Sequence, residues 1–330
     1  MPRHVKMTTN TNQYNARIEE LEKKDLNNID VIIQHNLPSE FVYSSKAKNI
    51  GCFAYETSGF PNSTWKQNLE MMDGIIVPCN FMTDLSYNPS TFVIPHAIDT
   101  EKFNKPTETY AFGTNKNTVK FYTISEYNKR KNISGLVLAY LSTFDANDNV
   151  VLVIKTVGSA QTIKTNINDI KFGLKRFDNI QRYAKIILIT DQVDDTTIDS
   201  IHSSCNVFVS ASYGEGFCIP AVEAMGWGNM LLVPHSTAFA DLHGHGNLLV
   251  ETNPTKCFGS VDSLRECYTS DEIWSSPSIL DMSALMREIY EYRLFEHEIK
   301  NRKEFVKSHY SRETIGKQYK NILENLLNAK

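Results

Sequence analysis

Two carboxylates stand eight residues apart in the stretch VFVSASYGEGFCIPAVEAMGWGNMLLV, residues 207–233. Glu215 lies in a glycine-rich turn after an apolar strand pattern, and Glu223 lies one turn into a helix that we expect to begin near Pro220. Ligands of open parallel sheets bind outside the carboxyl ends of the strands. Carboxylates there accept hydrogen bonds from hydroxyls, each worth roughly 1.5–3 kcal/mol. We therefore expect one carboxylate to hold sugar hydroxyls and the other a ribose diol, in one crevice. An ordinary turn and a solvated helix position are the alternatives.

The turn itself is suited to an anion. The amides of Gly216, Phe217 and Cys218 lead into the expected helix N-terminus, where unpaired N–H groups and the helix dipole favour a diphosphate. Gly216 would let backbone approach the ligand closely. Gly214 belongs to the same expected binding turn.

Charge is unevenly distributed along the chain. The net charge of −4 divides into −3 over residues 1–115, +7 over residues 116–185 and −8 over residues 186–330. The basic middle block indicates a phosphate-bearing ligand nearby, and a solvated helical face rich in lysine is the alternative. The overall charge provides no global attraction to nucleic acid or an anionic membrane.

Several classes of protein are disfavoured. The six cysteines form no CxxC pair and the chain has no Asp-x-Asp, so we expect no metal site. Scattered cysteines fit a reducing cytoplasm. Residues 1–24 lack the apolar core of a signal peptide, and the longest apolar runs span about five residues against the ~20 of a membrane helix. We expect a cytoplasmic protein without a transmembrane segment.

Apolar runs and helical spacing alternate along the chain, which predicts parallel sheets of doubly wound α/β type. The runs predict strands over 30–35, 49–55, 74–78, 91–95, 119–124, 150–154, 185–189, 207–210 and 230–233. Helical spacing covers 12–27, 64–72, 132–144 and 283–327, the last with a break near 308–311. The polar stretch around residues 104–118 predicts a linker between two domains.

Five short motifs occur in the order of a known family. EGFCIPAVEAMG at 215–226 resembles the E-x7-E signature of retaining glycosyltransferases of family 4. PHAIDTEKF at 95–103 resembles the family's PNGVDxxxF element, and KRKN at 129–132 resembles its basic turn. Residues 56–65 and 72–78 resemble a subgroup that reads ETxxxPxxW…DxxxVPS. Together these motifs extend the resemblance over roughly residues 30–330.

The resemblance implies a GT-B fold, in which two Rossmann-like doubly wound domains face each other across a cleft. We expect an N-terminal domain over 1–108, a linker over 109–118, a nucleotide-sugar-binding domain over 119–310, and a helix over 311–330 that returns toward the N-terminal domain. The N-terminal domain looks short and lacks the glycine-rich turn expected after a first strand. It is either trimmed or completed by another chain, which would make the protein an oligomer.

The resemblance also implies residue roles. Glu215 would contact the donor sugar, Glu223 would hold the nucleotide ribose, and Lys131 with Arg130 would neutralise the diphosphate leaving group. A fixed cation stabilises charge that develops on a leaving phosphate, so no metal is required. Gly214, Gly216, Phe217, Cys218 and Ser125 would line the donor site. The donor would be a nucleoside-diphosphate sugar, with UDP favoured by family frequency, and no cofactor is implied.

Three positions depart from the family pattern or extend it. Glu126 occupies the place of an arginine, so either the cationic clamp is weaker or Lys129, Arg130 or Lys155 compensates. Cys218 occupies the place of a glycine. Glu56 ends a strand where many relatives carry an active-site histidine, so it is a candidate catalytic residue.

His35 also ends a strand and could face the cleft, with a polar strand-end residue as the alternative. The expected function is retaining sugar transfer to a glycan, lipid or lipopolysaccharide-type hydroxyl. Transfer to modified bases of phage DNA and non-catalytic binding of nucleotide sugars are the alternatives.

Overall fold

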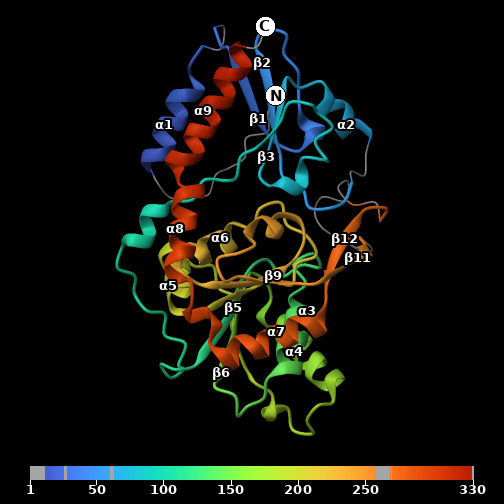
Figure 1. The fold of residues 1–330 in the computed structure, drawn as a ribbon, viewed down its shortest axis with the longest axis vertical. Helices are drawn as coiled ribbons and strands as arrows, with labels where there is room; N and C mark the ends of the chain where they lie inside the picture. Colours follow the sequence, from blue (N-terminus) through green and yellow to red (C-terminus); the bar gives the residue numbers. More distant parts are fainter. Residues whose placement is uncertain (1–11, 26–27, 60–62, 258–267, 269, 329–330) are drawn as a thin grey trace.

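The computed structural model describes residues 12–25, 28–59, 63–257, 268 and 270–328. The chain forms two lobes, each built on a parallel sheet (Figure 1). The N-terminal sheet has the order β1-β2-β3-β4. Its strands are β1 (Val31–His35), β2 (Lys48–Cys52), β3 (Gly74–Val77) and β4 (Thr91–Val93). One face packs against α2 (Ser63–Glu70) through a cluster that includes Trp65, Leu69 and Ile75. A further helix, α1 (Asn12–Glu22), precedes β1.

The C-terminal sheet is larger and has the order β10-β9-β8-β5-β6-β7, all parallel. Its strands are β5 (Val119–Ile124), β6 (Val150–Lys155), β7 (Lys185–Ile189), β8 (Val207–Val209), β9 (Met230–Pro234) and β10 (Leu248–Val250). The strand order reverses between β5 and β8, and such a reversal opens a crevice at the carboxyl ends of the strands.

Helices cover both faces of this sheet. One face carries α3 (Ile133–Thr143), α4 (Ala160–Leu174) and α7 (Ile279–Tyr292). The other carries α5 (Asp195–Ser204), α6 (Ile219–Trp227) and α8 (Ile299–Tyr310). The strands β6, β8 and β9 are buried along their whole length and are apolar except for Lys155 at the end of β6, as expected for a covered parallel sheet.

The chain crosses between the lobes twice. It first passes through η3 (Thr100–Asn104) into the C-terminal lobe, and it returns from α8 into α9 (Arg312–Asn328). The two crossings meet where the amide of Ile98 donates to the carbonyl of Tyr310 at 2.7 Å. Helix α9 lies against the N-terminal sheet (Figure 1), where Ile315 joins Ile50 and Ile76 in one apolar cluster. The N-terminal lobe is therefore made of two distant parts of the sequence.

The C-terminal helical stretch has a second break that the sequence pattern did not predict. Besides the break at Ser311, residues 293–298 interrupt the helix between α7 and α8. Arg293 and Glu298 have positive φ values of 49° and 58°, and Phe295 between them turns into the core. Burial of this aromatic ring outweighs the helical preference of its neighbours.

One buried arginine holds this break to the rest of the lobe. Arg302 in α8 is 0% exposed. Its guanidinium donates to the carbonyls of Gly228 (2.9 Å), His245 (3.1 Å), Phe295 (2.9 Å) and His297 (2.7 Å). It thereby ties the end of α6 and two loops to α8.

A hairpin of β11 (Thr252–Lys256) and β12 (Ile273–Pro277) was also not predicted. It reaches the N-terminal lobe, where the amide of Ser58 donates to the carbonyl of Ile273 at 3.1 Å. The ring of Trp274 stacks on Tyr213 with centroids 5.4 Å apart. The hairpin is therefore an additional connection between the lobes.

Candidate active site

A cavity of about 250 Å³ lies at the point where the order of the C-terminal sheet reverses. It lies at the carboxyl ends of β5 and β8 and beside the N-terminus of α6. Its lining residues are Thr123, Ile124, Ser125, Glu126, Arg130, Lys131, Phe208, Ser210, Glu215, Cys218 and Pro220. Five of the predicted site residues therefore come together here: Ser125, Arg130, Lys131, Glu215 and Cys218.

Glu215 is the centre of this cluster and is 4% exposed. Lys131 Nζ lies 2.6 and 2.8 Å from its two carboxylate oxygens, and an Arg130 nitrogen lies 3.1 Å from Oε2. The amide of Glu215 donates to Thr237 Oγ1 at 3.0 Å, and its carbonyl accepts from Ala238 at 3.1 Å. Burial alone would raise the pKa of Glu215, but Lys131 and Arg130 outweigh it and hold that pKa below its ordinary value.

Glu56 of the N-terminal lobe joins the same cluster. Arg130 Nε lies 3.1 Å from its Oε1, and the hydroxyl of Tyr268 donates to the same oxygen. Burial raises the pKa of Glu56, and Arg130 only partly offsets it. With Lys131 and Glu215, these groups form an interlobe network of two cations and two carboxylates.

The glycines of the turn face the other lobe. A Cβ at Gly214 would overlap the backbone carbonyl oxygen of Glu56, and a Cβ at Gly216 would lie 3.0 Å from the Cβ of Ala54. The close backbone approach expected at Gly216 is therefore made by the N-terminal lobe in this structure. The close approach of a ligand to Gly216 stays a prediction.

Gly214→Ala should force the lobes apart, because the obstructing atom belongs to backbone. We expect the free energy of unfolding to fall by about 1–3 kcal/mol, as in other overpacked sites. Small-angle scattering should show a larger radius of gyration. Gly173→Ala is the matched control, because nothing lies within 4 Å of a Cβ at Gly173. Equal scattering and stability in both variants would contradict the close approach.

Cys218 departs from the family pattern at a position with unusual backbone geometry. It is the N-cap of α6 with φ 67° and ψ 70°, a left-handed conformation that glycine adopts most easily. This left-handed conformation explains why glycine is the usual residue at this position of the family pattern. Burial raises the pKa of the Cys218 thiol to about 12, so it is protonated at neutral pH.

Glu223 is not in contact with Glu215, although one shared crevice was expected for both. Its Oε1 lies 2.5 Å from Lys102 Nζ, which also lies 2.8 Å from Asp199. Its Oε2 lies 3.8 Å from His202 Nε2. Lys102 comes from η3, inside the motif at 95–103, so the partner of Glu223 was present in the sequence but not recognised.

His202 lies behind Glu223 in a buried polar network and is 0% exposed. The Tyr122 hydroxyl lies 2.7 Å from His202 Nδ1, and the Asn229 side-chain amide donates to that hydroxyl at 2.8 Å. One of the two groups, the Tyr122 hydroxyl or the His202 Nδ1, therefore donates to the other. Burial lowers the pKa of His202 to about 3.

This histidine should make folding acid-sensitive. The unfolded imidazole binds a proton near pH 6.5, whereas the folded one does so only near pH 3. The stability is therefore complete above pH 6.5 and falls by about 1.4 kcal/mol for each pH unit below it. His202→Asn, which preserves a polar atom near Nδ1, should flatten the profile between pH 6.5 and 4.5. Urea unfolding at both pH values measures this, and parallel profiles would refute the assignment.

His35 lies at the lobe boundary but does not line the 250 Å³ cavity. Its ring stacks on His96 with centroids 5.8 Å apart, and His96 meets Phe217 edge-on at 5.0 Å. Phe217 is buried and also contacts Tyr310. The side chain of Phe217 is thus part of the interlobe packing.

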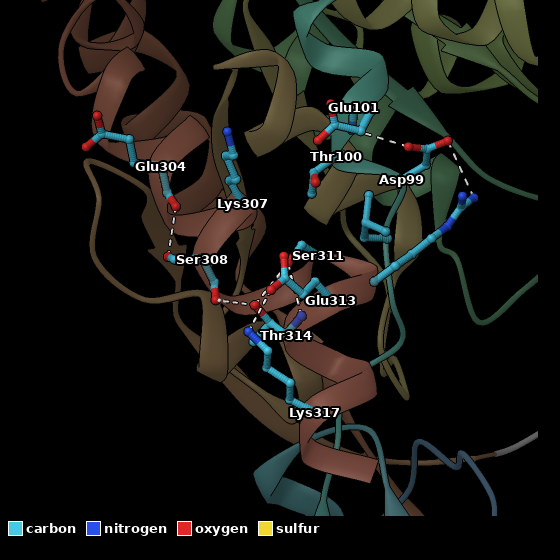
Figure 2. A pocket seen from close by; sticks show the side chains of 12 residues that line it. Asp99, Thr100, Glu101, Glu304, Lys307, Ser308, Ser311, Glu313, Thr314 and Lys317 are labelled. Carbon is cyan, nitrogen blue, oxygen red and sulfur yellow. Dashed lines mark hydrogen bonds and ion pairs between the residues drawn. The ribbon is translucent and has the colours of Figure 1, made fainter. Parts of the chain in front are cut away.

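A larger cavity of about 690 Å³ lies where the two crossings meet. Figure 2 shows its lining side chains, which come from η3, the end of α8 and the start of α9. None of the predicted site residues lines it. Four of its charged groups form two ion pairs, Arg312 with Asp99 at 3.4 Å and Lys317 with Glu313 at 2.6 Å.

The basic block divides between two places. Lys129, Arg130 and Lys131 lie in the turn beside the cavity, whereas Lys164 and Lys171 lie on α4, at the far end of the C-terminal lobe (Figure 1). The first group lies where the phosphate-bearing ligand is predicted, and that ligand stays a prediction. Within the described ranges, no three His, Cys, Asp or Glu side chains converge as a metal site would require.

The sequence model of the family described as "Glycosyl transferases group 1" matches residues 104–275, more than half of the 330 residues. This chain is a group 1 glycosyl transferase. A comparison with curated protein sequences found no match. In the described part of the glycosyl transferase, each helix is too short or too polar to cross a bilayer.

Solved structures with the same fold are distant in sequence. Sucrose-phosphate synthase from Thermosynechococcus elongatus is 15% identical with a TM-score of 0.65, covering 96% of this glycosyl transferase and 77% of that chain. HepE from Anabaena with UDP-glucose is 14% identical, with a TM-score of 0.58 and coverage of 85% and 73%. A TarM variant from S. aureus with UDP is 15% identical, with a TM-score of 0.58 and coverage of 84% and 51%. The chain thus spans about half of the TarM chain. The predicted GT-B fold with two Rossmann-like domains is confirmed.

Proposed function

We propose that this chain is a retaining glycosyltransferase of the family 4 type. It would transfer a sugar from a UDP-sugar to a hydroxyl of a glycan, lipid or lipopolysaccharide-type acceptor. The observation that carries the proposal is the cluster of Lys131, Arg130 and Glu215 at the strand-order reversal. The complexes of HepE with UDP-glucose and of TarM with UDP support a uridine nucleotide.

The reaction needs charge neutralisation at the leaving group. The bond between the anomeric carbon and the diphosphate oxygen breaks, and the acceptor oxygen bonds to the same face of that carbon. The acceptor proton passes to the departing diphosphate. Lys131 and Arg130 would stabilise the negative charge that develops there, in place of a metal ion. Glu215 would accept hydrogen bonds from donor-sugar hydroxyls.

Donor binding would have to rearrange the network. The two cations are already paired with Glu215 and Glu56, so the diphosphate would compete with these carboxylates. Nucleotide-sized ligands occupy pockets of ~300–1,000 Å³, and the cavity holds about 250 Å³. We therefore propose that the lobes separate to admit the donor and that Glu56 releases Arg130 as they do.

Donor binding and donor turnover test the proposal. The full chain is titrated by calorimetry with UDP, GDP, ADP and dTDP and is assayed for hydrolysis of the matching glucose, mannose and N-acetylglucosamine donors. We expect UDP to bind and at least one UDP-sugar to be hydrolysed. Absence of both binding and turnover with every nucleotide would refute the proposal. Binding without turnover, with or without added acceptor, would identify a non-catalytic binder instead.

A further inference from the structure

A buried lysine without a carboxylate partner ends strand β6. Lys155 is 5% exposed, and its Nζ donates to the carbonyl of Thr156 at 3.1 Å. No carboxylate of the described residues lies within ion-pair distance of it, although an ammonium has three hydrogens to donate. Burial lowers the pKa of Lys155, and the charge of Asp191 offsets this only in part.

The next residue, Thr156, also has a buried polar group. Thr156 is 2% exposed, and its Oγ1 has no hydrogen-bond partner in the described part of the chain. Lysines are almost never buried without a partner, because desolvation of the charge is not repaid. The Lys155 ammonium, which makes one hydrogen bond with its three hydrogens in the described part of the chain, therefore points to a group that is added on binding.

Their place in the sheet joins them to the candidate active site. Lys155 pairs in register with Ile124 of β5, and the amide of Ser125 donates to the carbonyl of Lys155 at 3.1 Å. Ile124 and Ser125 both line the 250 Å³ cavity. Lys155 therefore lies on the strand next to the one that lines the cavity, at the same carboxyl edge of the sheet.

The side chain of Lys155 also lies on the appropriate face. Side chains alternate along a strand, and register partners share a face. Val151 and Val153 of β6 belong to the apolar cluster that contains Tyr122 and residues of α6, so Lys155 lies on that face. This is the face where Tyr122 contacts His202, beside Glu223.

We propose that the Lys155 ammonium binds a phosphate oxygen of the donor nucleotide. This inference rests on the proposed function. Lys131 and Arg130 are neutralised by Glu215 and Glu56, whereas Lys155 offers a charge that no ion pair of the described residues neutralises.

The test compares nucleotide binding by three variants of the full chain. Lys155→Met removes the proposed contact, Thr156→Val removes the neighbouring hydroxyl, which strand alternation places on the opposite face, and Lys171→Met removes a lysine of α4. We expect Lys155→Met to weaken UDP binding at least tenfold, with Thr156→Val and Lys171→Met within twofold of the parent chain. Uridine, titrated to millimolar concentration, should bind Lys155→Met as it binds the parent chain, since it has no phosphate.

Thermal melting without nucleotide separates this role from a structural one. Removal of an uncompensated buried charge should leave the melting temperature unchanged or raise it, so a lowered melting temperature of Lys155→Met would assign this lysine to folding. UDP affinity within twofold of the parent chain, or equal losses for UDP and uridine, would also overturn the phosphate contact. In these cases the parent chain still binds UDP and the proposed function stands. A parent chain that binds no nucleotide would refute both.

Discussion

Lys131→Met should lower kcat/KM for sugar transfer by about 10²–10³-fold, the range found when one preorganised charge-stabilising donor is removed. Lys131 Nζ lies 2.6 Å from Glu215 at the helix N-terminus where the diphosphate is proposed to leave. Methionine retains the length of the side chain and removes the charge. Because the loss concerns charge that develops during reaction, kcat should fall more than donor affinity.

Initial rates with the best UDP-sugar measure this effect, and calorimetry with UDP separates binding from catalysis. Lys300→Met is the control, because Lys300 is an exposed lysine on α8 with only a long ion pair to Glu304 at 3.6 Å. Its rate should stay within twofold of the parent chain. A Lys131→Met enzyme with the parent kcat would remove Lys131 from the proposed mechanism.

Arg302→Met should lower the free energy of unfolding by several kcal/mol, because each hydrogen bond to a charged group contributes roughly 1.5–3 kcal/mol. The buried guanidinium donates to four carbonyl oxygens. Methionine fills similar space but donates no hydrogen bond, so these acceptors lose their partner. The loop at 293–298 should loosen first, because two of the four carbonyls belong to it.

Urea unfolding measures the loss, and hydrogen exchange of residues 293–298 locates it. Arg312→Met is the matched control, because Arg312 is an exposed arginine whose ion pair with Asp99 spans 3.4 Å. Its cost should stay below about 1 kcal/mol. Equal unfolding midpoints for the two variants would show that the buried hydrogen bonds contribute little.

Local pattern predicted most elements of the sheets. The strands over 119–124 and 185–189 have the bounds that the sequence predicted, because a short, mostly apolar run is typical of a parallel strand. Lys120 and Lys185 are the charged exceptions in these runs. The turn before α6 was also predictable, since glycine and proline restrict the backbone there. The apolar runs and the turn residues are local patterns that span only a few residues, so they can be recognised in a single sequence.

Contacts between distant segments were not predictable in the same way. Nothing near Tyr268 indicates that its hydroxyl reaches Glu56, because the contact depends on how the β11–β12 hairpin meets the other lobe. The pairing of Glu223 with Lys102 likewise depends on the path of η3. The motif spacing located each residue on its element, but the side-chain partners follow from tertiary packing.

The late return of α9 has a consequence for synthesis on the ribosome. The apolar face of the N-terminal sheet contains Ile50, Cys52 and Ile76, and it is covered by residues after Arg312. At about 5–20 residues per second, this face waits roughly 10–40 s between translation of β4 and translation of α9. Uncovered apolar surface favours aggregation during that interval. The nascent chain therefore buries this apolar face only after its last helix, α9, has been synthesised. A chain that terminates before Arg312 should keep the face exposed and be bound by chaperones.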